Sequence, residues 1–175
     1  MKNKIHEVAF TIKDGKRVLQ CHSRGDFRFS PFFCYIDSFG LNESIENHYQ
    51  QTKVFSKDGD FIKAKDWKEA KRMQKSNLYL NRGFFLPNGI YLGEENSSAE
   101  DLVIQYYIGL WYKFLSKNQY LIDIAKEFDD FEDPFEGKFP FGQAKVFQKV
   151  SREGLDSLYP MFQELNNLIN KFYGL

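Results

Sequence analysis

The pattern of apolar and polar positions predicts a β-hairpin near the start of the chain. Residues 5–12 alternate roughly in polarity and are rich in β-formers, and residues 17–21 supply a second strand after the turn signal Asp14-Gly15. The aromatic stretch 27–36 is interrupted by Pro31, so it predicts irregular or edge-strand structure. We therefore expect a small N-terminal β-element followed by less regular chain.

Helical spacing dominates the rest of the sequence. A cap at Asn42 or Ser44 predicts a helix to about residue 55, and a capping box at 97–101 predicts another to about residue 115. Gly154 is a candidate C-cap between the last two helices. Further helices are predicted over residues 66–73, 119–126, 143–152 and 157–172. Loops are predicted over residues 57–60 and 128–142, and a loop or short strand is predicted over residues 81–93.

Length and composition are those of one globular domain. A chain of 175 residues with 42% apolar residues can build a real hydrophobic core and leaves little room for a second one. The predicted fold class is therefore α+β: a mainly helical single domain over residues 1–175 with a small N-terminal β-element. Aromatic residues make up 18% of the chain, and their rings either fill the core or stack on a flat ligand such as a nucleobase.

Charge and cysteine content limit the classes of protein to which this chain can belong. With 24 basic and 24 acidic residues the formal net charge is zero, which weakens duplex binding but leaves a local basic patch open. Cys21 and Cys34 match no zinc pattern, so we predict no metal and no cofactor; a site built from both with His22 is the weaker alternative. No apolar stretch suits a signal peptide or a membrane span, so the expected location is the cytoplasm.

The segment 24–33 is a candidate phosphate-binding element. Arginine holds a phosphate through two parallel hydrogen bonds, and the glycine at position 25 lets backbone amides approach it. The alternative is a surface turn in which Arg24 and Asp26 pair with each other. The candidate substrate-binding residues of this segment are Arg24, Asp26, Arg28, Phe29, Ser30 and Phe32.

The segment 44–53 gathers chemically different side chains on one side of its predicted helix. Offsets of three, four and seven residues place Tyr49, Gln50 and Lys53 on the same side as Glu46. A solvated face normally carries more charge and fewer rings, so Glu46 is a candidate general base or electrostatic stabiliser. The alternative is a glutamate favoured by the helix dipole and paired with Lys53.

Two further segments supply candidate site residues. Trp67 lies in a charged helix, where it either stacks on a base or packs beneath that helix. Residues 128–135 place four acids among aromatic residues, which indicates a carboxylate in an apolar site, a cation site or a solvated acidic loop. A second carboxylate facing Glu46 would suit hydrolysis of a glycosidic bond, whose transition state resembles an oxocarbenium ion. Gln143 follows this loop as a candidate substrate-binding residue.

Residues 44–55 read Ser-Ile-Glu-Asn-His-Tyr-Gln-Gln-Thr-Lys-Val-Phe. This run resembles the NADAR family, which includes N-glycosidases acting on early riboflavin-pathway intermediates and whose pattern is roughly Thr/Ser-Val-Glu-His-Tyr-Tyr-Gln-Ala-x-Lys-Phe. Residues 29–33 resemble, more weakly, the Ser-Asn-Phe-Tyr stretch that precedes it in the family. The chain is also similar to a phage-associated group that carries a later Gln-Ala pair, as found here at Gln143.

The resemblance implies a YbiA-like fold and hydrolysis of an N-glycosidic bond in a ribosyl-phosphate intermediate or an ADP-ribosylated base. It makes Glu46 the essential carboxylate, supported by Tyr49 and Gln50, with Trp67 stacking on the base. It also matches Asp133 to the aspartate of the family's Asp-x-x-Trp-Gly motif and so makes it the second catalytic carboxylate. The chain departs from that motif, because Pro-Phe-Glu-Gly follows Asp133 and the tryptophan is absent.

The leading hypothesis is an N-glycosidase-like hydrolase whose ligand is a small nucleotide-derived molecule. In it, Arg24 and Arg28 hold phosphate, while Glu46 and Asp133 stabilise the cationic sugar and activate water. Nucleic acid becomes a partner if an ADP-ribosylated base is the substrate, and no membrane partner is expected. One alternative is a module that binds nucleotides or ADP-ribose without turnover, which the missing Trp-Gly pair favours. The other is a phage-type structural or interaction protein.

Overall fold

The computed structural model describes residues 10–134 and 141–174. Its strands are β1 (Phe10–Lys13), β2 (Lys16–Gln20), β3 (Tyr35–Ser38), β4 (Leu41–Ser44), β5 (Lys53–Lys57), β6 (Asp60–Lys63), β7 (Leu80–Phe85), β8 (Tyr91–Gly93) and β9 (Asp130–Glu132). These strands form three sheets: β1-β2-β9, the hairpin β3-β4, and a four-stranded sheet in the order β6-β5-β7-β8.

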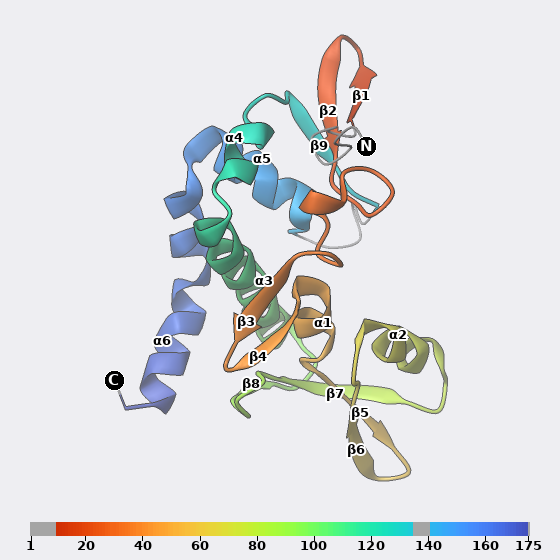
Figure 1. Ribbon diagram of the computed structural model, residues 1–175. Coiled ribbons are helices and arrows are strands. Elements are labelled where there is room, and N and C mark those ends of the chain that lie inside the picture. Colours follow the sequence, from red (N-terminus) through yellow and green to blue (C-terminus); the bar gives the residue numbers. More distant parts are fainter. Residues whose placement is uncertain (1–9, 135–140, 175) are drawn as a thin grey trace.

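One long helix packs against two of these three sheets. The α-helices are α1 (Ile45–Gln50), α2 (Trp67–Lys75), α3 (Ser97–Lys117), α4 (Tyr120–Ala125), α5 (Gln143–Glu153) and α6 (Gln163–Phe172), with 3₁₀ segments η2 (Phe27–Phe29) and η3 (Leu155–Phe162). α3 contacts α1 and β3 on one side and η3 and α6 on the other (Figure 1). Within the described ranges, no helix is both long enough and apolar enough to cross a bilayer.

The predicted N-terminal hairpin is confirmed over its described residues. β1 and β2 pair antiparallel, and Asp14 and Gly15 make the turn with positive φ angles of 51° and 76°. Residues 5–9 of the predicted first strand lie outside the described residues. β9, from the segment predicted as a structured loop, adds to this sheet parallel to β2, with Val18 opposite Asp130. The chain thereby returns to its N-terminal element from a distant part of the sequence.

The helix predicted to reach residue 55 is wrong in its second half. α1 ends at Gln50, where the Thr52 hydroxyl donates to the Tyr49 carbonyl at 2.7 Å and competes with continued helical bonding. Val54 and Phe55 then enter β5, buried between β6 and β7, because β-branched and aromatic residues suit a covered sheet.

Strands also occupy both ends of the predicted loop at residues 81–93, as β7 and β8. The predicted loop at residues 57–60 is the β5–β6 turn, where Asp58 and Gly59 adopt positive φ. The α+β class is therefore confirmed. The expectation that β-structure is confined to a small N-terminal element is wrong, since two further sheets follow it.

The C-terminal helices are interrupted by proline. Gly154 follows α5 with a φ of 89°, which confirms it as the cap. The single helix predicted over residues 157–172 is instead η3 followed by α6, since Pro160 lacks the backbone N–H that a continuous α-helix needs.

Most aromatic residues of the main core surround α3. Trp111 has no exposed surface and meets Phe147 and Phe114 edge-on, with ring centres 5.2 and 5.7 Å apart. A second, smaller cluster joins Phe55 of β5 to the buried Ala70 and Met73 of α2. α2 is therefore held against the four-stranded sheet and keeps its other face outside.

Candidate functional site

α1 begins at a buried serine that caps it. The Ser44 Oγ accepts a hydrogen bond from the Asn47 backbone N–H at 3.1 Å, as the predicted cap requires. Just after the cap, the Ile45 N–H donates to the Cys34 carbonyl at 2.8 Å, and the Glu46 N–H donates to the carbonyl of residue 31 at 3.0 Å. The first turn of α1 is therefore tied to the aromatic segment before it, which fixes the position of Glu46.

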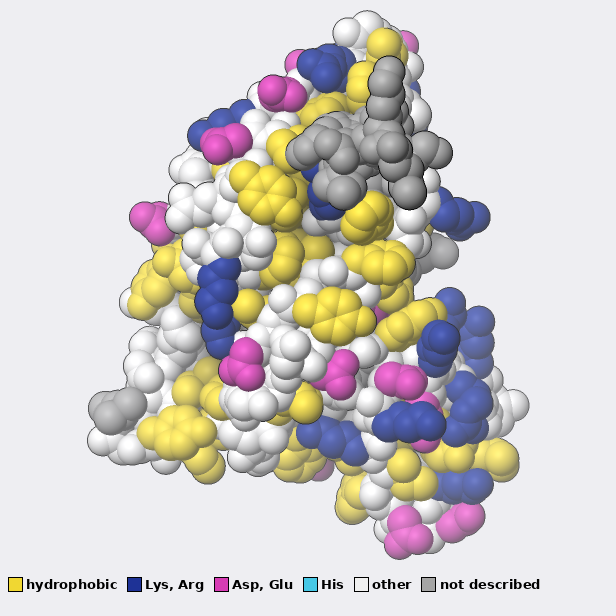
Figure 2. Space-filling view, viewed as in Figure 1, with side chains coloured by type: hydrophobic (Ala, Val, Ile, Leu, Met, Phe, Trp, Pro, Cys, Tyr) yellow, Lys and Arg dark blue, Asp and Glu magenta, His cyan; other side chains and the backbone are white. Residues whose placement is uncertain are grey.

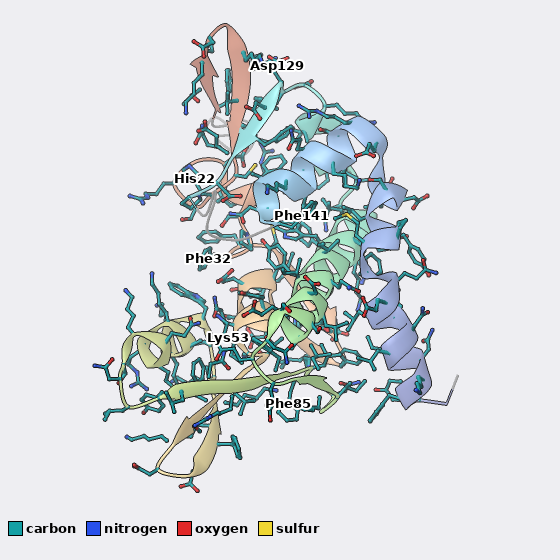
Figure 3. The ribbon with its side chains drawn as sticks, turned by 180° about the vertical axis from the view of Figure 1, so that it is seen from behind. His22, Phe32, Lys53, Phe85, Asp129 and Phe141 are labelled. Atoms are coloured by element: carbon teal, nitrogen blue, oxygen red, sulfur yellow. The ribbon has the colours of Figure 1, made fainter. Side chains whose placement is uncertain are left out.

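The Glu46 carboxyl lies almost wholly inside the protein, with 8% of the residue exposed. Its Oε1 accepts a hydrogen bond from Gln50 Nε2 at 2.8 Å, and Gln50 Oε1 accepts one from Lys53 Nζ at 2.8 Å. We call these three residues the Glu46 relay, because one amide links a carboxyl to an amine. Their predicted proximity is confirmed, although Lys53 reaches α1 from the first position of β5 rather than from the helix (Figure 3).

Burial brings the proton affinities of the two ends of the relay closer together. It raises the pKa of the Glu46 carboxyl, while the hydrogen bond from Gln50 and the positive charges of Lys53 and Lys71 oppose that rise. Burial also lowers the pKa of Lys53 to about 8, against the negative charges of Glu46 and Glu95. An acid and an amine adjusted in this way are suited to exchanging protons near neutral pH.

A phenol ring covers one side of the relay. The Lys53 ammonium lies 5.0 Å from the centre of the Tyr49 ring, and Tyr49 meets Tyr107 of α3 edge-on with 5.8 Å between ring centres. Burial raises the pKa of the Tyr49 phenol, so this group stays protonated at neutral pH.

Trp67 is positioned at the start of α2 by α1 itself. Its backbone N–H donates to Asn47 Oδ1 at 3.0 Å, and its ring meets Phe32 edge-on with 4.8 Å between ring centres. Trp67 and Phe32 are both half-buried, so neither is sealed inside the core. In Figure 3, Phe32 and Lys53 both lie close to α1. The structure therefore brings an aromatic pair to the helix that carries Glu46.

Asp133 approaches this region from the far end of the chain. Its Oδ2 accepts a hydrogen bond from the Ala144 N–H at 3.1 Å, at the start of α5. Burial raises the pKa of the Tyr107 phenol, and the negative charges of Glu46 and Asp133 raise it further. Both predicted carboxylates therefore lie within electrostatic reach of Tyr107, whose hydroxyl donates to Gln143 Oε1 at 3.2 Å.

Several predicted substrate-binding residues lie in the interior, among them Phe29, Ser30 and Gln143. Phe29 and Ser30 have no exposed surface, and Gln143 has 2%. Phe29 packs edge-on against Phe147 at 4.7 Å, and Gln143 Nε2 donates to the Cys21 carbonyl at 3.0 Å. Phe29 and Ser30 therefore pack inside the protein, and their contact with a ligand stays a prediction.

The segment 24–33 contains an ion pair other than the one considered from sequence. Arg28 donates from Nε to Asp26 Oδ1 at 3.0 Å and from Nη2 to Asp26 Oδ2 at 2.7 Å. The alternative in which Arg24 pairs with Asp26 is therefore wrong, and Arg24 lies exposed in the same loop. Arg28 would have to share its guanidinium with Asp26 to hold a phosphate, whereas Arg24 as a phosphate ligand stays a prediction.

Sequence reasoning missed three residues that shape the site. Asn47 links α1 to Trp67, Lys71 of α2 acts electrostatically on Glu46, and Tyr107 interacts electrostatically with both carboxylates. The helical spacing of Tyr107 marks it only as a buried position of α3. No local pattern signals the other two roles, because they depend on how α2 and α3 pack against α1.

A cavity of about 810 Å³ lies against the four-stranded sheet. Val54, Phe85, Tyr91 and Glu95 are among its lining residues, and none of the predicted site residues lines it. Glu95 nevertheless lies close enough to Lys53 to act on its pKa, so the cavity and the relay share one charged neighbour.

The chain matches no protein-family model and no curated protein. Within residues 10–134 and 141–174, no group of three or more His, Cys, Asp or Glu is placed to hold a metal ion. Cys21 and Cys34 are free and buried. What the site offers is acid–base chemistry from a buried carboxyl, an amine and phenols, beside an aromatic pair that suits a planar group.

Proposed function

We propose that the protein is an N-glycosidase-like hydrolase acting on a nucleotide-derived substrate, with an ADP-ribosylated base as one candidate. The observation that carries this proposal is the Glu46 carboxyl, which is nearly buried and held by Gln50 within reach of a buried amine. The resemblance of residues 44–55 to the NADAR pattern supports the same residue independently of the geometry.

Breaking an N-glycosidic bond leaves positive charge on the sugar. When the C1′–N bond breaks, its electron pair stays with the base nitrogen and the sugar becomes an oxocarbenium-like cation. An ionised Glu46 in an apolar setting stabilises that cation more strongly than water does. Glu46 is therefore the electrostatic stabiliser in this mechanism.

Two proton transfers complete the reaction. The departing base nitrogen needs a proton, and Lys53, with a pKa lowered to about 8, is the best matched donor of the relay. Water then attacks C1′ and loses a proton to Asp133, the second carboxylate near Tyr107. Trp67 and Phe32 would hold the base by stacking, and Arg24 would bind phosphate.

Direct assay of base release tests the proposal. Purified protein is incubated with ADP-ribosylated guanine and, separately, with early riboflavin-pathway intermediates, and free base is measured by liquid chromatography. We expect release of base with an equal amount of sugar product from at least one substrate. No release from any of them overturns the proposal. If these ligands raise the melting temperature without being consumed, the result instead favours a binding module without turnover.

The pH dependence of kcat/KM should be bell-shaped. Glu46 acts ionised, so the rate rises as pH passes its raised pKa. Lys53 acts protonated, so the rate falls as pH rises through its pKa of about 8. Initial rates from about pH 4 to about pH 10 check this profile. In the Lys53→Arg variant, whose guanidinium keeps its proton, the basic limb should move to higher pH. A basic limb unchanged in that variant would remove Lys53 from the role of acid.

A further inference from the structure

Charge is distributed unevenly in this electrically neutral chain. Residues 53–82 hold nine Lys or Arg and four Asp or Glu, whereas the rest of the chain holds fifteen and twenty. This basic stretch contains β5, β6, α2 and the first part of β7. Figure 2 shows the corresponding Lys and Arg side chains gathered over the part of the surface around α2. The local basic patch that the overall charge left open is therefore present.

The outer face of α2 carries a row of four cations. Offsets of three, four and seven residues place them on one side of the helix, and all four are exposed. Only one of them is in an ion pair that the structure shows, a 3.7 Å contact between Arg72 Nη2 and Glu69 Oε1. We call this row the α2 stripe: Lys68, Lys71, Arg72 and Lys75.

The α2 stripe runs beside the candidate site and is flanked by rings. The positive charge of Lys71 acts on the Glu46 carboxyl, and Lys68 lies 5.7 Å from the ring centre of Trp67. Tyr79 also lies beside the stripe, with the Arg72 guanidinium 5.9 Å from its ring centre. Cations that follow a backbone, interleaved with rings that accept unpaired bases, are the elements of a single-strand binding surface.

We propose that the α2 stripe binds single-stranded nucleic acid through its phosphates and leads one base toward Trp67. Binding of the strand does not depend on the proposed hydrolysis; only the delivery of a base to Glu46 rests on it. A membrane surface is the competing partner, because the same basic stretch exposes Phe61, Leu78 and Leu80, and binding to vesicles is therefore one outcome of the test.

Fluorescence anisotropy with labelled oligothymidine of about twenty nucleotides tests this surface. We expect the wild-type protein to bind, with an affinity that falls steeply as salt increases. The triple variant Lys68→Gln, Lys71→Gln, Lys75→Gln should bind at least about tenfold more weakly, and its salt slope should be shallower by about 2, since each lost phosphate contact changes the slope by about 0.7.

The matched control removes three exposed lysines elsewhere. Lys117→Gln, Lys126→Gln, Lys171→Gln changes the net charge equally and should bind the oligonucleotide within about twofold of wild type. Equal losses in both triple variants, or no wild-type binding, would overturn the proposal. Vesicles containing phosphatidylserine test the membrane alternative. Binding to these vesicles but not to the oligonucleotide also overturns the proposal of single-strand binding.

The proposals of strand binding and of hydrolysis can be refuted independently of each other. Glu46→Gln should keep strand binding, because Glu46 lies outside the stripe and carries no positive charge. If the strand binds but no base is released from any substrate, the proposed hydrolysis is wrong and the α2 surface stands. If free nucleotides are hydrolysed but no strand binds, the α2 surface is wrong and the hydrolysis stands.

Discussion

Replacing Glu46 with Gln should lower the rate of base release by about a hundredfold to a thousandfold and leave the fold intact. Glutamine has the shape of glutamate, and its carbonyl oxygen can still accept the 2.8 Å hydrogen bond from Gln50. It carries no charge, so the positive sugar loses its nearest stabilising partner. Burying a neutral amide also costs less than burying a carboxylate, so the melting temperature should not fall.

Glu43 provides the matched control for this experiment. It lies half-buried just before α1 and accepts a hydrogen bond from Asn47 Nδ2 at 3.1 Å. Glu43→Gln is the same chemical change outside the relay, so kcat/KM should change by less than about threefold. Base release that is unaffected by Glu46→Gln, or reduced equally by both variants, would contradict the role given to Glu46.

Replacing Asp26 with Ala should lower the free energy of unfolding by about 3–5 kcal/mol. The Asp26 side chain is 2% exposed and its partner Arg28 is 11% exposed, so the substitution leaves a poorly hydrated guanidinium without its carboxylate. It also removes the acceptor of the Arg28 backbone N–H, which caps η2 at 3.1 Å. Urea denaturation followed by circular dichroism measures the change.

Asp37 forms a comparable ion pair at the surface and provides the control for Asp26. It lies 3.8 Å from the Lys113 ammonium, and the two side chains are about half exposed, at 50% and 44%. Because water screens this pair, Asp37→Ala should lower the free energy of unfolding by less than about 1 kcal/mol. Similar losses in the two variants would show that burial of the Asp26–Arg28 pair adds nothing to its contribution.

Agreement between sequence and structure is best where an interaction spans one helical turn. The contact between Glu46 and Gln50 follows from an offset of four residues, and the Ser44 cap follows from its side-chain chemistry. Lys53 was placed on the same helix face, yet it reaches Gln50 from β5 after the chain has left the helix. The predicted neighbour is right, and the local structure assumed for it is wrong.

Contacts between distant segments were open to sequence reasoning only through resemblance. Asp133 was matched to a family motif, and the structure places it at the start of α5 within electrostatic reach of Tyr107. Arg28, grouped with Arg24 as a phosphate ligand, donates two side-chain hydrogen bonds to the Asp26 carboxylate, and its contact with a phosphate stays a prediction. Arg24 and Arg28 both lie two residues from Asp26, and a pair at that spacing can form in an exposed turn or in a buried one. Spacing alone therefore could not decide which arginine pairs with Asp26.

The sequence by itself determined the elements whose causes are local. Caps, turn residues and helical spacing located the first hairpin, the helix starting near residue 97, whose cap proved to be Asn96, and the end of α5 at Gly154. Only the tertiary structure decided which polar groups are buried and what they face. Glu46 and Lys53 are buried where α1 packs against α3 and where the Lys53 amine of β5 bonds to Gln50. The proton affinity of each group follows from these surroundings rather than from its neighbours in sequence.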